Sequence, residues 1–356
     1  MNPSDVSGGR VDPTARFSPG FAEWLAETDT CLILTSYQSG RVFFCTLDSL
    51  GKVALQHLDF DRPMGISRSK GGFSFGGLHR LWRYTHLRQQ KPDAGGTVIL
   101  APASAHYTGF LNCHDIGVLE DGTALVASSL TNSVLSLSPG GTFTHLWSPG
   151  FIESLQFEDI CHLNGLAADS KGLRYVSVLG TEALPGTWRR DASKGAIYDA
   201  TSNLPVATDL WMPHSPRLNG DELYALESAK GSFGRVGDGK IEEQVFLPGF
   251  TRGLDFLGSM AAIGLSRIRP TSTMATPLSR RLAQSRTESS CGVILFDLKE
   301  RVVRHSLIFD NGVDEIFDVA FVQGVKNPRL VHPDSSDALK TFAFTSPILV
   351  DQGRSK

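Results

Sequence analysis

The sequence predicts an all-β protein, a six-bladed β-propeller with four-stranded antiparallel blades around a central channel. Two observations predict the strands: short apolar runs rich in Val, Leu, Tyr and Phe, and polar or glycine turns between them. A third observation predicts their arrangement, because a strand-turn-strand unit recurs along the chain. A repeat of about 50 residues that holds several short strands matches a propeller blade.

The recurring unit can be aligned six times. Its equivalent positions are Gly65, Asp115, Gly165, Ser215, Gly253 and Asp318. The first three intervals are 50 residues each, and the last two are 38 and 65 residues. A two-sheet sandwich, the competing all-β architecture, does not by itself produce such a repeat.

The order of segments predicts one domain. We expect a single propeller over 21–350, between a flexible N-terminus (1–20) and a flexible tail (351–356). The clearest helical signal is the amphipathic segment 21–28. The longest interval between units contains 266–290, with five arginines and one glutamate. It is predicted to be an inserted basic loop, either a mobile surface loop or a lid over one face.

Composition excludes several classes of partner. A formal net charge of −3 and a pI near 6.4 give no electrostatic footprint for nucleic acid or an anionic membrane. The lack of an apolar leader or a long apolar run predicts a cytoplasmic protein. Five widely spaced cysteines without a CxxC pair predict reduced, buried thiols. A small-molecule substrate is therefore the expected partner, and the residues carry no signal for an oligomeric state.

The residues that precede the six aligned positions are candidates for a functional site. The first strand of each blade lines the channel, so its leading residues meet at the mouth. These residues, which form one column of the alignment, are Met64, His114, Asn164, His214, Arg252 and Phe317. Side chains repeat with period two along a strand, which places His162 on the same side as Asn164. The ring therefore predicts His114, His162 and His214 as catalytic residues, with Asn164 and Arg252 binding substrate.

Two chemistries fit this ring. The histidines can act as general acid and base near neutral pH while Arg252 holds an anionic group of the substrate. Alternatively, a divalent metal ion is the cofactor, with His114, His162, Asn164 and His214 as ligands. Arg252 weighs slightly against a bare metal ion, because two neighbouring cations repel each other. A third interpretation is that these side chains only close the channel by hydrogen bonding.

Four further residues are predicted to support substrate binding. Asp115 and Asp255 lie one and three residues beyond their column positions, where they orient a histidine or Arg252, or else cap turns. Trp188 and Arg189 follow the second strand of blade three as a stacking and anion-binding pair, or as surface packing. Cys161 adjoins His162, but adjacent strand residues point to opposite faces, which disfavours a nucleophilic pair.

Several motifs carry a resemblance to a known family. CHLNGLA, MPHSPR and PGFTRGL resemble the signature of an uncharacterised bacterial family of conserved proteins of unknown function, and the resemblance runs from about Thr35 to Pro328. The stretch NGLAADSKGLRYVS is also similar to gluconolactonase-like and strictosidine-synthase-like six-bladed propellers. That similarity implies a role for Asn164 at the central site, beside a divalent metal in the lactonases.

The chain departs from this family pattern at three positions. The pattern has an acidic residue where this chain has Asn112, an arginine at Ile160 and a tyrosine at Phe317. These departures imply an altered activity or a different substrate, and the neutral Asn112 weakens the metal interpretation.

Together these observations predict an enzyme that acts on a small anionic metabolite at the channel mouth by histidine acid-base chemistry. Hydrolase, lyase and isomerase reactions are all compatible, and a metal-assisted reaction is the close variant. The alternative is a non-catalytic propeller that serves as a ligand-binding or protein-interaction module.

Overall fold

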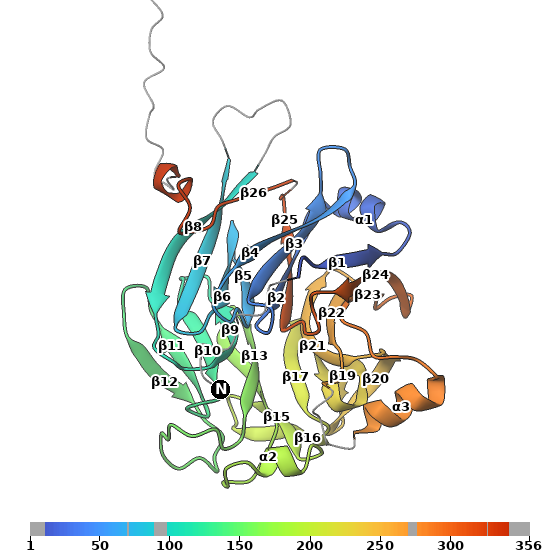
Figure 1. Ribbon diagram of the computed structural model, residues 1–356. Coiled ribbons are helices and arrows are strands. Elements are labelled where there is room, and N and C mark those ends of the chain that lie inside the picture. Colours follow the sequence, from blue (N-terminus) through green and yellow to red (C-terminus); the bar gives the residue numbers. More distant parts are fainter. Residues whose placement is uncertain (1–10, 70, 89–97, 270–275, 326, 342–356) are drawn as a thin grey trace, which may run out of the picture.

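The computed structural model describes residues 11–69, 71–88, 98–269, 276–325 and 327–341. Within them, six antiparallel sheets follow one another around a common centre, which confirms the six-bladed propeller (Figure 1). We number the blades by the six units of the sequence. In each blade the first strand of the unit is innermost.

Five blades are built from strands that are consecutive in the chain. Blade one consists of β5 (Ile66–Ser69), β6 (Gly72–Gly76), β7 (Arg80–Arg88) and β8 (Val98–Tyr107), with β26 (Arg329–Leu330) added in parallel at its edge. Blade two consists of β9 (Cys113–Val118), β10 (Ala124–Ser128), β11 (Ser133–Leu137) and β12 (Phe143–Trp147). Blade three consists of β13 (Leu163–Asp169), β14 (Gly172–Val178), β15 (Gly195–Asp199) and β16 (Leu204–Leu210).

The next two blades repeat this arrangement. Blade four consists of β17 (Pro213–Asn219), β18 (Glu222–Glu227), β19 (Ser232–Gly237) and β20 (Lys240–Phe246). Blade five consists of β21 (Phe250–Leu257), β22 (Met260–Ser266), β23 (Gly292–Asp297) and β24 (Val302–Asn311). Four short helices accompany blades three to five and the C-terminal segment: α2 (Thr187–Arg190), η1 (Ser228–Lys230), α3 (Pro277–Ser285) and η2 (Ala338–Lys340).

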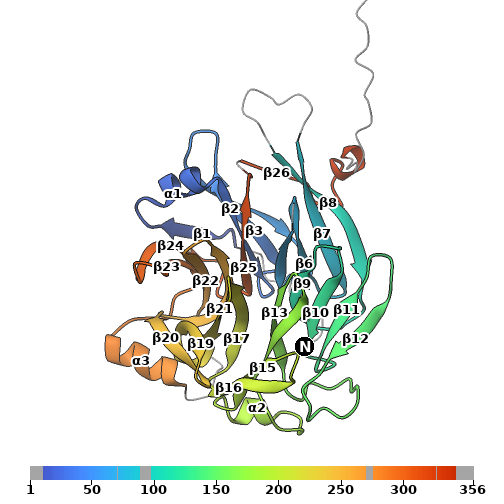
Figure 2. The ribbon, with the colours of Figure 1, turned by 180° about the vertical axis from the view of Figure 1, so that it is seen from behind.

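Blade six closes the ring with strands from both ends of the chain. Its innermost strand, β25 (Asp318–Gln323), pairs with β2 (Thr30–Ser36), which continues to β3 (Arg41–Leu47) and β4 (Val53–Asp59). Seen from behind, β25 runs beside β2 and β3 (Figure 2). The predicted helix is α1 (Phe21–Thr28), which buries Phe21 and Leu25 against the core.

The flexible N-terminus predicted for 1–20 is wrong for Thr14–Phe17. These residues form β1, which pairs with β24 at the edge of blade five. The pairing adds main-chain hydrogen bonds and packs Phe17 against Phe21. Residues 1–10 and the predicted flexible tail 351–356 lie outside the described residues.

The basic stretch 266–290 is not a loop throughout. Residues 277–285 form α3, which buries Leu278 and Leu282. Arg281 binds Glu243 of blade four at 2.7 Å and lies over the ring of Phe246. The sequence of α3 explains why this segment is helical. Proline is favoured at the first helical position, and the apolar face of the helix packs against the protein. Residues 270–275 of this stretch lie outside the described residues.

Aspartates stabilise many of the turns that separate the strands. In each case a carboxylate oxygen accepts the backbone N–H two residues further along, as in Asp48 to Leu50 (2.8 Å), Asp121 to Thr123 (2.8 Å) and Asp169 to Lys171 (2.7 Å). This local bond is the reason that aspartate favours turns over strand interiors. The aspartates between the apolar runs of the sequence therefore stabilise the turns directly.

At the level of the six aligned positions, adjacent inner strands meet in two alternating ways. At three junctions a side chain accepts a backbone N–H of the next blade: Asp318 from Ile66 (2.8 Å), Asp115 from Leu166 (3.0 Å) and Ser215 from Gly253 (3.1 Å). At the other three, a glycine packs against the next strand: Gly65, Gly165 and Gly253. A Cβ atom on Gly65 would lie 2.6 Å from Cα of Asp115, so only glycine permits this approach.

Apolar side chains fill the spaces between neighbouring sheets. Phe43 of blade six, for example, packs against Phe309 of blade five. All five cysteines are buried free thiols. Among the described residues, no helix combines the length and apolar character needed to cross a membrane.

Candidate active site at the channel mouth

The chain enters four inner strands through the same backbone conformation. The residues two positions before the column take φ angles of 49°, 50°, 49° and 51°, at Arg62, Asn112, His162 and Met212 respectively. Residues with a side chain adopt this left-handed region only where the surrounding structure imposes it. Its recurrence at intervals of 50 residues shows that the blades share one entry geometry, which sets the direction of each mouth side chain.

His114 of blade two and Arg252 of blade five meet across the channel. Arg252 donates from Nη2 to Nδ1 of His114 at 2.9 Å, and its guanidinium lies 3.5 Å above the ring of Phe317. Because a guanidinium can only donate, Nδ1 of His114 carries no proton. The neutral imidazole therefore has its proton on Nε2, where it can act as a donor.

His162 has the opposite polarity. Its Nδ1 donates to Oδ2 of Asp159 at 2.7 Å, which leaves Nε2 as the lone-pair atom of the neutral ring. The ring lies 4.6 Å from that of His114 and 4.0 Å from that of Trp188, measured between centroids. The guanidinium of Arg189 lies 4.1 Å from the centroid of the Trp188 ring. Its Nη2 atom lies 3.6 Å from Oδ2 of Asp159.

His214 is fixed by two oxygen atoms. Its Nδ1 lies 3.0 Å from the carbonyl of Met212 and 2.8 Å from Oγ of Ser228. Ser228 gives its own proton to the carbonyl of Thr251 at 2.5 Å, so it accepts from His214. His214 thus carries its proton on Nδ1 and, like His162, presents Nε2 as an acceptor.

The side chain of Asn164 is hydrogen-bonded to the strands that form the wall of the mouth. It donates from Nδ2 to the carbonyl of Pro213 at 2.9 Å and accepts from Ser177 Oγ at 2.6 Å. The bond to Pro213 joins blade three to blade four, and the bond from Ser177 lies within blade three. Among the described residues, one N–H of the amide and one lone pair of its oxygen have no further partner, so both are available to a ligand.

The three histidines are held neutral. Burial lowers the pKa of His114 and of His214 well below 6.5, and the positive charge of Arg252 lowers both further. Burial also lowers the pKa of His162, although Asp159 opposes this shift. At neutral pH the mouth therefore offers one N–H donor and two basic nitrogens.

A second charged layer closes the channel a few residues further along the inner strands. Arg217 binds Asp115 at 2.7 Å and 3.0 Å and Asp318 at 3.4 Å. Asp255 accepts the N–H of Phe321 and pairs with Arg68 at 3.5 Å. The predicted roles of Asp115 and Asp255 in orienting a histidine or Arg252 therefore have no counterpart, since both carboxylates serve this layer.

Three residues of the mouth lie outside the residues that the sequence predicted. Asp159 and Ser228 orient His162 and His214, as described above. Glu315 occupies the same position in blade six that His162 occupies in blade three, two residues before the column. Extending that row of the alignment to all six blades would have found Glu315.

The described residues do not suit a metal ion. Within the ranges given above, no group of three His, Cys, Asp or Glu side chains is arranged to hold one. The Nδ1 atoms of His114, His162 and His214 already have protein partners, and the guanidinium of Arg252 touches His114. Asn112, where the family pattern is acidic, binds Ser129.

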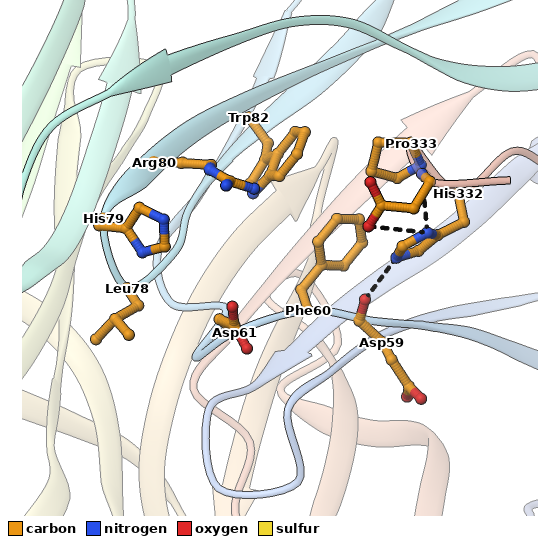
Figure 3. Close-up of a pocket in the computed structure, with 10 residues that line it drawn as sticks. Asp59, Phe60, Asp61, Leu78, His79, Arg80, Trp82, His332 and Pro333 are labelled. Carbon is orange, nitrogen blue, oxygen red and sulfur yellow. Dashed lines mark hydrogen bonds and ion pairs between the residues drawn. The ribbon is translucent and has the colours of Figure 1, made fainter. Parts of the chain in front are cut away.

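A separate pocket of about 300 Å³ lies at the junction of blades six and one (Figure 3). Its lining includes Asp61, Arg80 and Trp82, and Phe60 lies at its centre in the view. His332 closes one side, where Nε2 donates to the carbonyl of Asp59 at 3.0 Å. None of the lining residues belongs to the mouth, so the pocket is distinct from the histidine site.

Fold and site together define a six-bladed propeller with a polar channel mouth. The chain belongs to the family described as Domain of unknown function (DUF4915), whose pattern matches residues 19–331. This confirms the predicted membership of an uncharacterised family. No curated protein matches the chain.

Several solved structures are similar to the chain at low sequence identity. A protein of unknown function from Bacteroides caccae is 14% identical with a TM-score of 0.49, and the match covers 83% of this chain and 99% of that one. A luciferin-regenerating enzyme is 14% identical with a TM-score of 0.41, covering 88% and 99%. Virginiamycin B lyase from Staphylococcus aureus is 14% identical with a TM-score of 0.39, covering 65% and 73%.

Proposed function

We propose that this protein is an enzyme that binds a small organic anion at the channel mouth and transforms it by histidine acid-base chemistry. The observation that carries the proposal is the environment of Arg252. Among the described residues no carboxylate lies within ion-pairing distance of its guanidinium, and its hydrogen-bond partner is the neutral His114. A largely shielded cation without a counter-ion is a site for an anionic ligand.

The imidazoles beside this cation supply the two roles that proton transfer needs. His162 accepts a proton at Nε2, and Asp159 stabilises the imidazolium that results. His114 donates a hydrogen bond from Nε2 to an oxygen on which negative charge develops. The two rings lie close enough to act on one small molecule. Hydrolysis, elimination and isomerisation all use such a pair, and no step requires a metal ion.

Protonation of His162 sets the expected pH dependence. Its pKa lies below 6.5, so the basic form is already present at neutral pH. At saturating substrate, the rate should rise through the acidic range, as His162 loses its proton, and then reach a plateau.

A substrate screen tests the proposal. Purified protein is incubated with a panel of small carboxylates and phosphate esters, and each mixture is followed by NMR. We expect conversion of one class, with a loss of at least about 100-fold in His162→Ala, a typical contribution of a general base. His106→Gln, on β8 away from the mouth, is the matched control and should remain active. Binding without turnover across the panel would instead indicate a non-catalytic ligand-binding module.

A further inference from the structure

Glu315 is a buried carboxyl group with an incomplete set of partners. Only 5% of the residue is exposed. Its Oε2 atom accepts long bonds from the N–H of Gln38 (3.2 Å) and from Ser36 Oγ (3.4 Å). Its Oε1 atom is enclosed and has no hydrogen-bond partner among the described residues. Such orphaned atoms are rare in folded proteins and require an explanation.

Arginines lie near this carboxyl without pairing with it. The charges of Arg252 and Arg269 both act on Glu315, yet the described part of the chain contains no ion pair to it within 4 Å. Arg269 instead donates to the hydroxyl of Tyr37. The other titratable neighbour is the buried thiol of Cys291, and Asp314, next in the chain, binds Arg267. Burial therefore favours the neutral acid, whereas the two arginine charges and the bonds from Gln38 and Ser36 favour the carboxylate.

We propose that Glu315 controls anion binding at Arg252. A neutral Glu315 leaves the guanidinium charge free for the ligand, and an ionised Glu315 competes with the ligand for that charge. This inference rests on the anion site of the proposed function and adds its regulation. Burial raises the pKa of Glu315 to about 7, against the opposing charge of Arg252, so the change falls in the physiological range. Ligand binding should accordingly take up protons near neutral pH.

Sulfate is a suitable probe because its charge stays constant between pH 6.5 and 8.5. Burial lowers the pKa of all three mouth histidines below 6.5, so their neutral forms predominate across this window. We expect sulfate affinity of the wild type, followed by NMR of ¹⁵N-labelled arginine side chains, to fall about three- to tenfold from pH 6.5 to 8.5. That range corresponds to an interaction of roughly half to one pKa unit.

Glu315→Gln should bind sulfate almost equally at the two pH values, and with at least the wild-type affinity at pH 8.5. Glu300→Gln, in the turn between β23 and β24, is the matched control and should follow the wild type. An unchanged pH dependence in Glu315→Gln would overturn the proposal, because Asp318, which also titrates near 7, would then be responsible.

A second measurement needs no variant. Calorimetric titration of the wild type with sulfate, in buffers of different ionisation enthalpy, should show uptake of a fraction of a proton near pH 7.5. Zero uptake would contradict the inference. Binding with this uptake but without turnover of any substrate would contradict only the proposed enzyme, whereas failure to bind sulfate at any pH would contradict both.

Discussion

Two arginines of the same channel have opposite environments. Arg217 is surrounded by carboxylates, with Asp115 and Asp318 in direct contact. Burial alone would lower its pKa, but these carboxylates raise it overall. Arg252, nearer the mouth, contacts a neutral imidazole and an aromatic face instead. A partly buried arginine with its counter-ions built in connects blades, whereas one without an ion pair among the described residues is the centre of the proposed anion site.

The largest expected effect comes from exchanging the two arginines for methionine. Arg217→Met leaves two carboxylates buried without their partner, so the free energy of unfolding should fall by about 3–5 kcal/mol. Arg252→Met removes a cation that has no ion pair among the described residues, so it should cost much less stability than Arg217→Met while abolishing sulfate binding. Urea denaturation of both variants measures the difference, and equal losses of stability would refute the contrast.

A smaller effect concerns the dependence of stability on pH. The pKa of Glu315 is raised above its unfolded value, so its contribution to stability is fully present at acidic pH and is lost as pH rises through about 7. Glu315→Gln should therefore weaken the loss of stability between pH 5 and 8 by about 2–3 kcal/mol. Urea denaturation across this range tests it, with Glu300→Gln again as control. Parallel wild-type and Glu315→Gln curves would show that Glu315 is already ionised.

The smallest expected effect concerns the hydrogen bond between His162 and Asp159. In Asp159→Asn the imidazole of His162 loses the carboxylate that opposes its downward shift. The pKa of His162 should then fall further below its usual value, because the hydrogen bond and charge of Asp159 are what hold it up. NMR titration of ¹⁵N-labelled histidine measures this shift, and the signal of His106 serves as an internal reference. A rise in the pKa of His162 would contradict the assigned tautomer.

The fold could be predicted because its cause is repetitive. Every blade packs the same kind of sheet against its neighbours, so turns and apolar runs recur at measurable intervals. The aligned glycines lie where inner strands approach each other. The corresponding errors involve non-repeating segments. Strand β1 and helix α3 are stabilised by partners that no other blade possesses, which a repeat cannot reveal.

The mouth was predictable only in part. The column identified His114 and Arg252 because both lead inner strands. It failed for Arg217, because β17 carries a bulge between His214 and Arg217 that breaks the period of two. It failed for the role of Asp115 because that role depends on contact with Arg217, 102 positions further along the chain. Contacts across a ring are not visible in local spacing.

Closure of blade six has a consequence for the order in which the site is completed. Strand β25 pairs with β2, and the residues just before it, Glu315 and Phe317, lie against Gln38 and Arg252. During synthesis from the N-terminus, β2 to β4 therefore wait for nearly 300 residues before their inner partner emerges. The proposed anion site is then complete only in the finished ring, and an unfinished chain lacks it even when five of its blades have formed.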